Sequence, residues 1–193
     1  MDSLIGRALV ASPFLNDPNF LRSVVYILEH NEEGAIGLIL NRPTDRTIRD
    51  LLGDVAGIDV DDDSLIFWGG PVDGPLMLMQ EIRKGDKTGI FAASDQAKIL
   101  ELFRQRGHGT DSIEAAAANL RGNFRLFDGY AGWSAGQLDA ELSDGGWLIW
   151  EIESDQIFGD PSEIWQTAIK AIGRDVLTVG IDPTKLPDDP AYN

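Results

Sequence analysis

The chain has 193 residues, no cysteine, and 32 acidic against 16 basic side chains, which gives a formal net charge of −16. The absence of cysteine excludes disulfide frameworks, thiolate metal sites and cysteine nucleophiles, and it agrees with a cytoplasmic location. A strongly acidic surface repels phosphate backbones and anionic lipids at long range, so we expect no membrane association and no direct contact with nucleic acid.

The length predicts one domain over residues 1–182, followed by a flexible tail over 183–193. The first predicted strand runs from Arg7 to Ala11. Two near-continuous apolar runs follow, from Val24 to His30 and from Ala35 to Leu40, and strands of this kind are usually covered on both faces. Because Gly34 closes the short polar loop between them, we expect a central hairpin.

The rest of the chain mixes helices and strands without a regular βαβ rhythm. A capping box formed by Thr47 and Asp50 predicts a helix from Thr47 to Val55. Ser94 as an N-cap predicts a second helix over Ser94–Arg106. Further helices are expected over Ser112–Leu120, Ser134–Leu142 and Pro161–Ile172, the last ended by Gly173. Strands are expected over Leu65–Trp68, Leu76–Ile82, Gly89–Ala93, Phe124–Phe127 and Trp147–Ile152. The pattern predicts an α+β fold with a mixed, largely antiparallel sheet flanked by helices.

The stretch from Gly132 to Gly136 fits G-x-S-x-G, the pattern that holds the nucleophile of many serine hydrolases. A serine nucleophile needs a general base, and in the hydrolase order the histidine follows it. Here both histidines, His30 and His108, precede Ser134. The alternative is a capping box in which Ser134 and Gln137 begin a helix, and this interpretation is favoured.

Several residues are candidates for ligand binding. Asn41 and Arg42 end the second apolar strand, where Arg42 either binds an anion or pairs with Asp45 or Asp50. The glycines of the Gly69-Gly70 pair either present backbone N–H groups to an anion or form a tight turn, and the turn is favoured. A groove beside Arg42 is a further candidate, with Tyr130, Trp133 and Gln137 as its expected lining, although aromatic residues are more often buried in a core than used for binding.

Metal and phosphate sites have weaker support. Glu29 and His30 are adjacent on a strand and point to opposite faces, and the acidic run from Asp61 to Asp63 lacks the spacing of a calcium loop. We therefore expect no metal and no cofactor. The segment from Lys98 to Phe127, with five basic residues, is the one place where a phosphate contact is plausible, whereas no Lys or Arg occurs from Leu126 to Ile169.

A set of short motifs spread over most of the chain carries a family resemblance. The motifs are Gly6–Pro13, Asp17–Phe20, Arg22–Tyr26, Glu29–Asn31, Gly34–Pro43, Gly69–Val72, Gly129–Trp133, Gly136–Leu138, Trp165 and Ile172–Gly173. Together they resemble the AlgH/YqgE family of bacterial proteins. The resemblance implies a cytoplasmic, single-domain α+β protein whose molecular function is not established, although some members are described as transcriptional regulators. It supplies no catalytic residues, and the position of Ser134 varies in the family pattern.

Three functions follow as hypotheses. The favoured one is a non-catalytic binding or regulatory protein, which acts through a contact with another protein or with a small anionic ligand. The second is a hydrolase that uses Ser134 with His30 or His108. The third is a regulator that binds DNA directly, which the net charge opposes.

Overall fold

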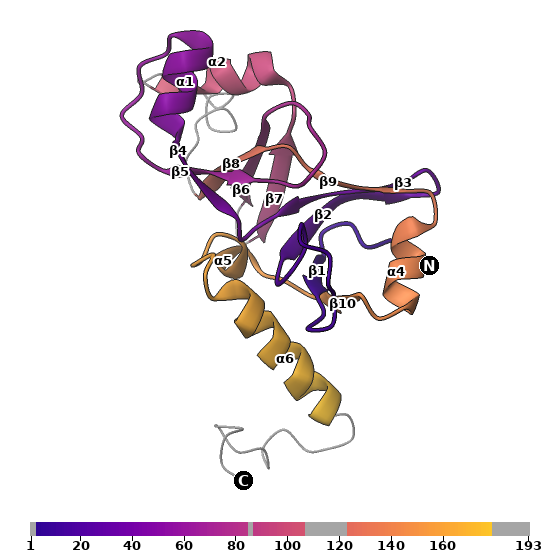
Figure 1. The fold of residues 1–193 in the computed structure, drawn as a ribbon. Helices are drawn as coiled ribbons and strands as arrows, with labels where there is room; N and C mark the ends of the chain where they lie inside the picture. The colour runs from indigo at the N-terminus through magenta and orange to yellow at the C-terminus, as the bar shows by residue number, and fades with distance from the viewer. Residues whose placement is uncertain (1–2, 85–86, 107–122, 179–193) are drawn as a thin grey trace.

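The computed structural model describes residues 3–84, 87–106 and 123–178, which form two five-stranded sheets with helices packed against them (Figure 1). The predicted helix over 112–120, His108 and the tail over 183–193 lie outside the described residues. The α+β class predicted from the sequence is confirmed. The strands, however, divide between two sheets, whereas the sequence analysis predicted one.

The first sheet, sheet A, is antiparallel throughout, with the strand order β10-β1-β2-β3-β9. Its strands are β1 (Ala8–Ala11), β2 (Val24–Asn31), β3 (Gly34–Ile39), β9 (Ala131–Ser134) and β10 (Trp147–Trp150). The predicted central hairpin is confirmed, because Asn31 of β2 pairs with Gly34 of β3. Gly34 has a φ of +141°, as the turn requires.

The second sheet, sheet B, has the order β4-β5-β8-β6-β7, and β5 and β8 form its parallel pair. Its strands are β4 (Pro43–Thr47), β5 (Leu65–Trp68), β6 (Met77–Lys84), β7 (Lys87–Ala93) and β8 (Phe124–Asp128). The chain passes from sheet A to sheet B between β3 and β4, and it returns between β8 and β9 through Gly129 and Tyr130. The second passage brings the candidate site to the junction of the sheets.

The helices are α1 (Ile48–Ala56), α2 (Gln96–Arg106), α4 (Gln137–Ser143), α5 (Ser154–Ile157) and α6 (Ile164–Thr178). The capping box of α1 is confirmed: the Thr47 hydroxyl accepts from the Asp50 N–H at 3.1 Å, and the Asp50 carboxylate accepts from the Thr47 N–H at 3.3 Å. None of the described helices is long and apolar enough to cross a membrane.

The predicted start of α2 and both predicted ends of α6, Pro161 and Ile172, are wrong. At the start of α2 the capping hydrogen bond comes from Asp95 and not from Ser94, since Asp95 Oδ1 accepts from the Lys98 N–H at 3.1 Å. Helix α6 continues through Gly173 to Thr178. A glycine inside a helix costs about 1 kcal/mol but ends the helix only where it adopts the left-handed conformation.

Three hydrophobic clusters hold these layers together. In β2, Val24 and Tyr26 face the central cluster, which also contains Phe67 and Phe127 of sheet B. The alternate residues Val25 and Ile27 face a second cluster on the other side of sheet A. A third cluster fills the space between sheet B and helices α1 and α2 (Figure 1). The apolar runs are therefore covered on both faces, as predicted.

Candidate functional site

Two glycine-containing segments cross each other where the sheets meet. A Cβ atom on Gly69 would lie 2.1 Å from the carbonyl oxygen of Gly129, and one on Gly70 would lie 2.3 Å from the amide nitrogen of Ala131. No side chain fits at such separations, so the pair is required for this backbone contact. The structure thus gives Gly69 and Gly70 a packing role, and both are buried.

An open groove of about 300 Å³ lies beside this crossing. The end of the β2–β3 hairpin contributes Glu29, Asn31 and Glu33 to its lining, and the segments at the crossing contribute Val72 and Tyr130. The remaining lining residues belong to β3 and β9 and are Gly34, Ala35, Ile36, Gly132 and Trp133. A volume of this size is at the lower end of the range for small-molecule sites.

The groove unites some of the predicted site residues and not others. Tyr130 and Trp133 both line it, but Gln137 does not. The two glycines at the crossing, Asn41 and Arg42 are also absent from its lining. Two of the three residues expected beside Arg42 thus belong to the lining of this groove, and Arg42 does not. The side chain of Trp133, however, packs in the cluster on the other face of sheet A, because Trp133 alternates with Gly132 along β9.

The ring of Tyr130 forms a fixed wall of the groove. A Cβ atom on Gly74 would lie 2.7 Å from Tyr130 Cε1, and one on Gly132 would lie 3.4 Å from Tyr130 Cε2. The ring therefore sits against two glycine backbones. Its segment is held by paired hydrogen bonds of 3.0 Å between the backbones of Val72 and Tyr130. An aromatic wall held in this way loses little conformational entropy when a ligand binds.

Two carboxylates stand at the groove without partners. Within the part of the chain that the structure describes, the side chains of Glu29 and Glu33 make no hydrogen bond and no ion pair, although Asn31 Oδ1 accepts from the Glu33 N–H at 2.8 Å. Among the residues that the structure describes, no Lys, Arg or His lines the groove. The lining therefore presents negative charge and apolar surface together, which opposes the small anionic ligand that the sequence analysis considered.

Ser134 is the last residue of β9, and its hydroxyl has a structural partner. Ser134 Oγ and the Ser134 N–H both donate to Gln137 Oε1, each at 3.1 Å. The glutamine thus reaches back as the predicted capping box requires. However, α4 begins at Gln137 with Gly136 as its N-cap, so the prediction that the helix begins at Ser134 is wrong.

His30 does not face Ser134. The register of sheet A aligns His30 with Ala35, and Ala35 with Trp133. Because successive side chains of a strand point to opposite faces, the side chain of Ser134 faces away from the side of the sheet that His30 shares with Trp133. His30 Nδ1 instead accepts from the Leu4 N–H at 3.2 Å. No basic side chain among the described residues contacts Ser134 Oγ.

Helix α4 is joined to sheet A through Glu141. Glu141 Oε2 accepts from the indole N–H of Trp133 at 3.0 Å and from that of Trp147 at 2.8 Å, and Oε1 accepts from Gln137 Nε2 at 2.9 Å. The ring of Phe20 stacks on Trp133 and meets Trp147 edge-on. The Trp-rich acidic segment noted in the sequence is thus, at this point, a packed and hydrogen-bonded unit that fixes the position of Trp133.

Asn41 and Arg42 connect β3 to the loop before β2. Asn41 Oδ1 accepts from the Val24 N–H at 3.0 Å, and its Nδ2 donates to Arg22 O at 2.9 Å. Arg42 donates to the carbonyl oxygens of Leu21 and Asn41, and not to Asp45 or Asp50. Burial lowers the pKa of Arg42.

The basic segment from Lys98 to Phe127 is not an open phosphate site in its described part. Lys98 and Arg104 pair with Asp95 and Glu101. Arg125 is buried, with hydrogen bonds to the carbonyl oxygens of Leu40 at 3.1 Å, Ile157 at 2.7 Å and Gly159 at 2.5 Å. Burial lowers the pKa of Arg125 to about 10, and the charge of Asp160 opposes this shift.

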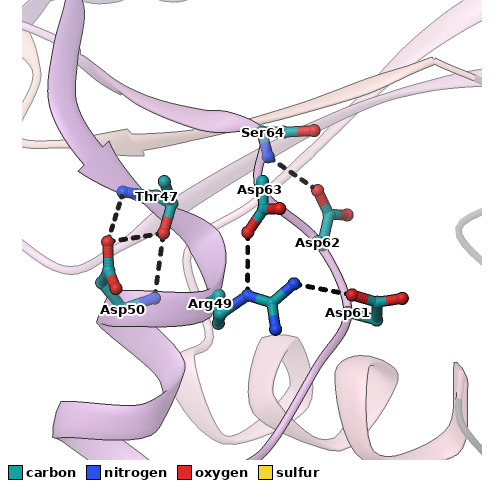
Figure 2. Close-up of polar contacts among 7 residues, drawn as sticks. All are labelled: Thr47, Arg49, Asp50, Asp61, Asp62, Asp63 and Ser64. Carbon is teal, nitrogen blue, oxygen red and sulfur yellow. Dashed lines mark hydrogen bonds and ion pairs between the residues drawn. The ribbon is translucent and has the colours of Figure 1, made fainter.

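An arginine from α1 pairs with two carboxylates of the acidic loop before β5 (Figure 2). Arg49 Nε donates to Asp63 at 2.8 Å, and Arg49 Nη2 donates to Asp61 at 2.6 Å. Asp62 Oδ1 accepts from the Ser64 N–H at 3.0 Å. Among the residues that the structure describes, no group of three or more His, Asp or Glu side chains is arranged to hold a metal ion.

From the sequence, the segment Glu29–Glu33 was weighed only as a source of metal ligands, with a solvated hairpin end as the favoured interpretation, so neither Glu29 nor Glu33 was assigned to a ligand groove. The signal that could have found them is their position at the end of the β2–β3 hairpin, whose strand β3 pairs with β9. That signal was hidden because β9 was not predicted, and without it nothing placed Tyr130 beside the hairpin.

Comparison with known proteins places this architecture in a family. A family model described as AlgH-like matches residues 8–177. A UPF0301 protein of Streptomyces coelicolor is 36% identical over all of this chain and 97% of its own, and one of Idiomarina loihiensis is 35% identical over 94% and 98%. The solution structure of AlgH from Pseudomonas aeruginosa is 29% identical with a TM-score of 0.64, and covers 92% of this chain and 94% of that one. The fold, the matched residues and these relatives together show that this chain belongs to the AlgH-like family.

Proposed function

We propose that this protein is a non-catalytic binding protein whose ligand occupies the groove between the β2–β3 hairpin and Tyr130. The observation that carries the proposal is the groove itself: an open site of about 300 Å³ with a fixed aromatic wall and two carboxylates free of partners within the described chain. Sites for small molecules combine apolar walls with a few polar groups in this way.

Two observations support binding over hydrolysis. The Ser134 hydroxyl is engaged with Gln137, and His30 lies on the other face of the sheet. A fluorophosphonate probe is therefore expected to leave Ser134 unlabelled. Labelling of the wild-type protein but not of Ser134→Ala would instead support the hydrolase.

A regulatory role, if the protein has one, is proposed to run through this ligand or through a protein partner, in the cytoplasm. Direct DNA binding has little support. The net charge is −16, Arg125 is buried, and Lys98 and Arg104 are each paired with a carboxylate. A gel-shift titration at low salt is expected to show no tight binding that weakens steeply as salt is added.

The test of the proposal is a thermal-shift panel on three proteins. Gly132→Leu places a side chain in the groove, where a Cβ atom would meet only Tyr130 and Val72 at 3.4 Å or more. Gly89→Leu is the matched control, because its Cβ would lie in open space on β7. The panel spans linear amines, amino acids, carboxylic acids, nucleotides and sugar phosphates.

We expect at least one class to raise the melting temperature of the wild type and of Gly89→Leu but not of Gly132→Leu. A shift that is equal in all three proteins would place binding elsewhere. A panel without any shift would count against a small-ligand site and leave only a protein partner for this groove.

A further inference from the structure

The charge and shape of the groove also indicate which chemical class of ligand it binds, an inference that rests on the proposed function. We propose that the groove binds a linear alkyl diamine or polyamine, with an ammonium group at each of Glu29 and Glu33 and the alkyl chain along the apolar lining. The argument has three steps: the charge of the site, its aromatic wall and its apolar surface.

The first step is charge. Seven ion pairs occur among the described residues, and neither Glu29 nor Glu33 takes part in any of them. By contrast, two carboxylates of the acidic loop near α1, Asp61 and Asp63, are both paired with Arg49 (Figure 2). The groove thus keeps two carboxylates available, inside a protein whose net charge of −16 attracts cations at long range.

The second step is the aromatic wall. The Tyr130 ring lines the groove, and Gly74 and Gly132 hold it in place. An ammonium group over the face of a tyrosine ring is attracted by the ring quadrupole, by about 0.5–1 kcal/mol at exposed sites. Within the described part of the chain, no Lys or Arg lines the groove to compete for this position.

The third step is the apolar surface. Ile36 and Val72 join Tyr130 in lining the groove, so the site offers hydrocarbon contact as well as charge. A metal ion would need several converging oxygen ligands and would leave this surface unused. An alkyl chain with a charged group at each end uses both parts of the lining.

The test is isothermal titration calorimetry of the full-length protein with 1,5-diaminopentane. The matched probes are 1-aminopentane, which has a single ammonium group, and 1,5-pentanediol, which has the same length and no charge. The diamine is expected to bind at a ratio of one to one and at least fivefold more tightly than the monoamine, and the diol is expected to give no heat of binding. Equal affinity for the diamine and the diol would overturn the proposal.

The variants separate local charge from net charge. Glu29→Gln and Glu33→Gln each remove one groove carboxylate and are expected to weaken diamine binding at least fivefold. Glu32→Gln removes the same charge from the turn between them, at a residue outside the groove lining, and is expected to change affinity less than twofold. If all three variants weaken binding equally, the effect is the general field of the protein and the proposal is wrong.

A final titration distinguishes a free diamine from the lysine side chain of a peptide as the ligand. N-acetyl-lysine-methylamide carries one ammonium group and is expected to bind no better than 1-aminopentane. Tighter binding of this compound than of the diamine would replace the proposal with peptide recognition. If no amine binds while another panel compound is lost only in Gly132→Leu, this inference fails and the proposed function stands. If Gly132→Leu affects no ligand, both fail.

Discussion

Arg125 is a buried cation whose hydrogen bonds run to three carbonyl oxygens on different segments. It extends from β8 to the end of β3 and to the residues around α5, and its guanidinium carbon lies 4.4 Å from the centre of the Phe67 ring. A planar group with five donors suits several acceptors at once, whereas an ammonium group does not. This single side chain therefore connects the two sheets through polar contacts.

Replacing Arg125 with methionine is expected to lower the free energy of unfolding by about 2–4 kcal/mol, because buried carbonyl groups lose their donors. Arg125→Lys is expected to recover only part of that loss. The control is Arg46→Met, which removes an exposed pair with Asp54 and is expected to cost less than about 1 kcal/mol. Urea denaturation measures all three, and equal losses at Arg125 and Arg46 would contradict the connecting role.

Asp50 gives a prediction about pH. The hydrogen bonds from Thr47 lower the pKa of Asp50 below its usual value. Because the folded-state pKa is depressed, the stabilisation is present above the unfolded-state pKa and is lost as the pH falls through the folded-state value. The difference in urea midpoint between the wild type and Asp50→Asn should therefore be larger at pH 7 than at pH 2.5. A difference that does not change with pH would show that the carboxylate charge has no role in the cap.

Helix α4 packs on the face of sheet A that carries the side chain of Trp133, opposite the face of Ile36 and Gly132. Its Glu141 satisfies two indole N–H groups, and its Leu138 packs in the cluster below sheet A. A hydrogen bond to a charged group contributes about 1.5–3 kcal/mol, so the position of Trp133 depends strongly on this helix.

Replacing Glu141 with alanine should destabilise the protein by about 2–4 kcal/mol, because two indole donors lose their acceptor. It should also weaken the near-ultraviolet circular dichroism of the tryptophan cluster. Glu151→Ala, which removes a carboxylate paired with Arg7 at the surface, is the control and should leave the spectrum unchanged. An unaltered spectrum in Glu141→Ala would contradict the account of this element.

Elements with strong local signals were predictable from the sequence. The β2–β3 hairpin follows from two apolar runs and Gly34, and α1 follows from its capping box. Strand β9 was missed because its four residues include a glycine and follow a glycine-rich stretch, so no alternation is visible. It is a strand because β3 supplies its hydrogen bonds, which is information that local sequence does not carry.

The division into two sheets and the groove were predictable only in part. Tyr130 and Trp133 were expected in a groove beside Arg42, with burial in the core as the alternative; both belong to the groove lining, while the side chain of Trp133 packs in a hydrophobic cluster. Glu29 and Glu33 reach it through the pairing of three strands, which depends on tertiary structure. Arg125 was assigned to a phosphate-binding segment because its burial between the sheets has no local signature.

At the scale of the whole molecule, the crossing of Gly69 and Gly70 with the Gly129 segment determines how the two sheets meet. Gly70→Ala would force a Cβ atom against the backbone of Tyr130 and Ala131, at a φ of +153°. We expect a loss of more than about 3 kcal/mol of unfolding free energy, because the clash is with backbone that cannot move independently.

The control for that substitution is Gly53→Ala in α1, where a Cβ atom would meet nothing within 4 Å. It should stabilise the protein by about 0.5–1 kcal/mol, because alanine loses less backbone entropy in a helix. If the crossing is as tight as the structure shows, chemical denaturation will give a lower free energy of unfolding for Gly70→Ala and a higher one for Gly53→Ala. Two small effects of the same sign would contradict it.

The central claim is that this protein works by binding at the groove, and photo-crosslinking in cells tests it most directly. Benzoylphenylalanine replaces Asn31 at the groove or Ser143 at the end of α4, and intact-mass spectrometry detects the adducts. We predict a discrete adduct of constant mass at position 31 that disappears when Gly132→Leu is added, and no such adduct at position 143. An adduct that forms equally at both positions, or that survives Gly132→Leu, would contradict the claim.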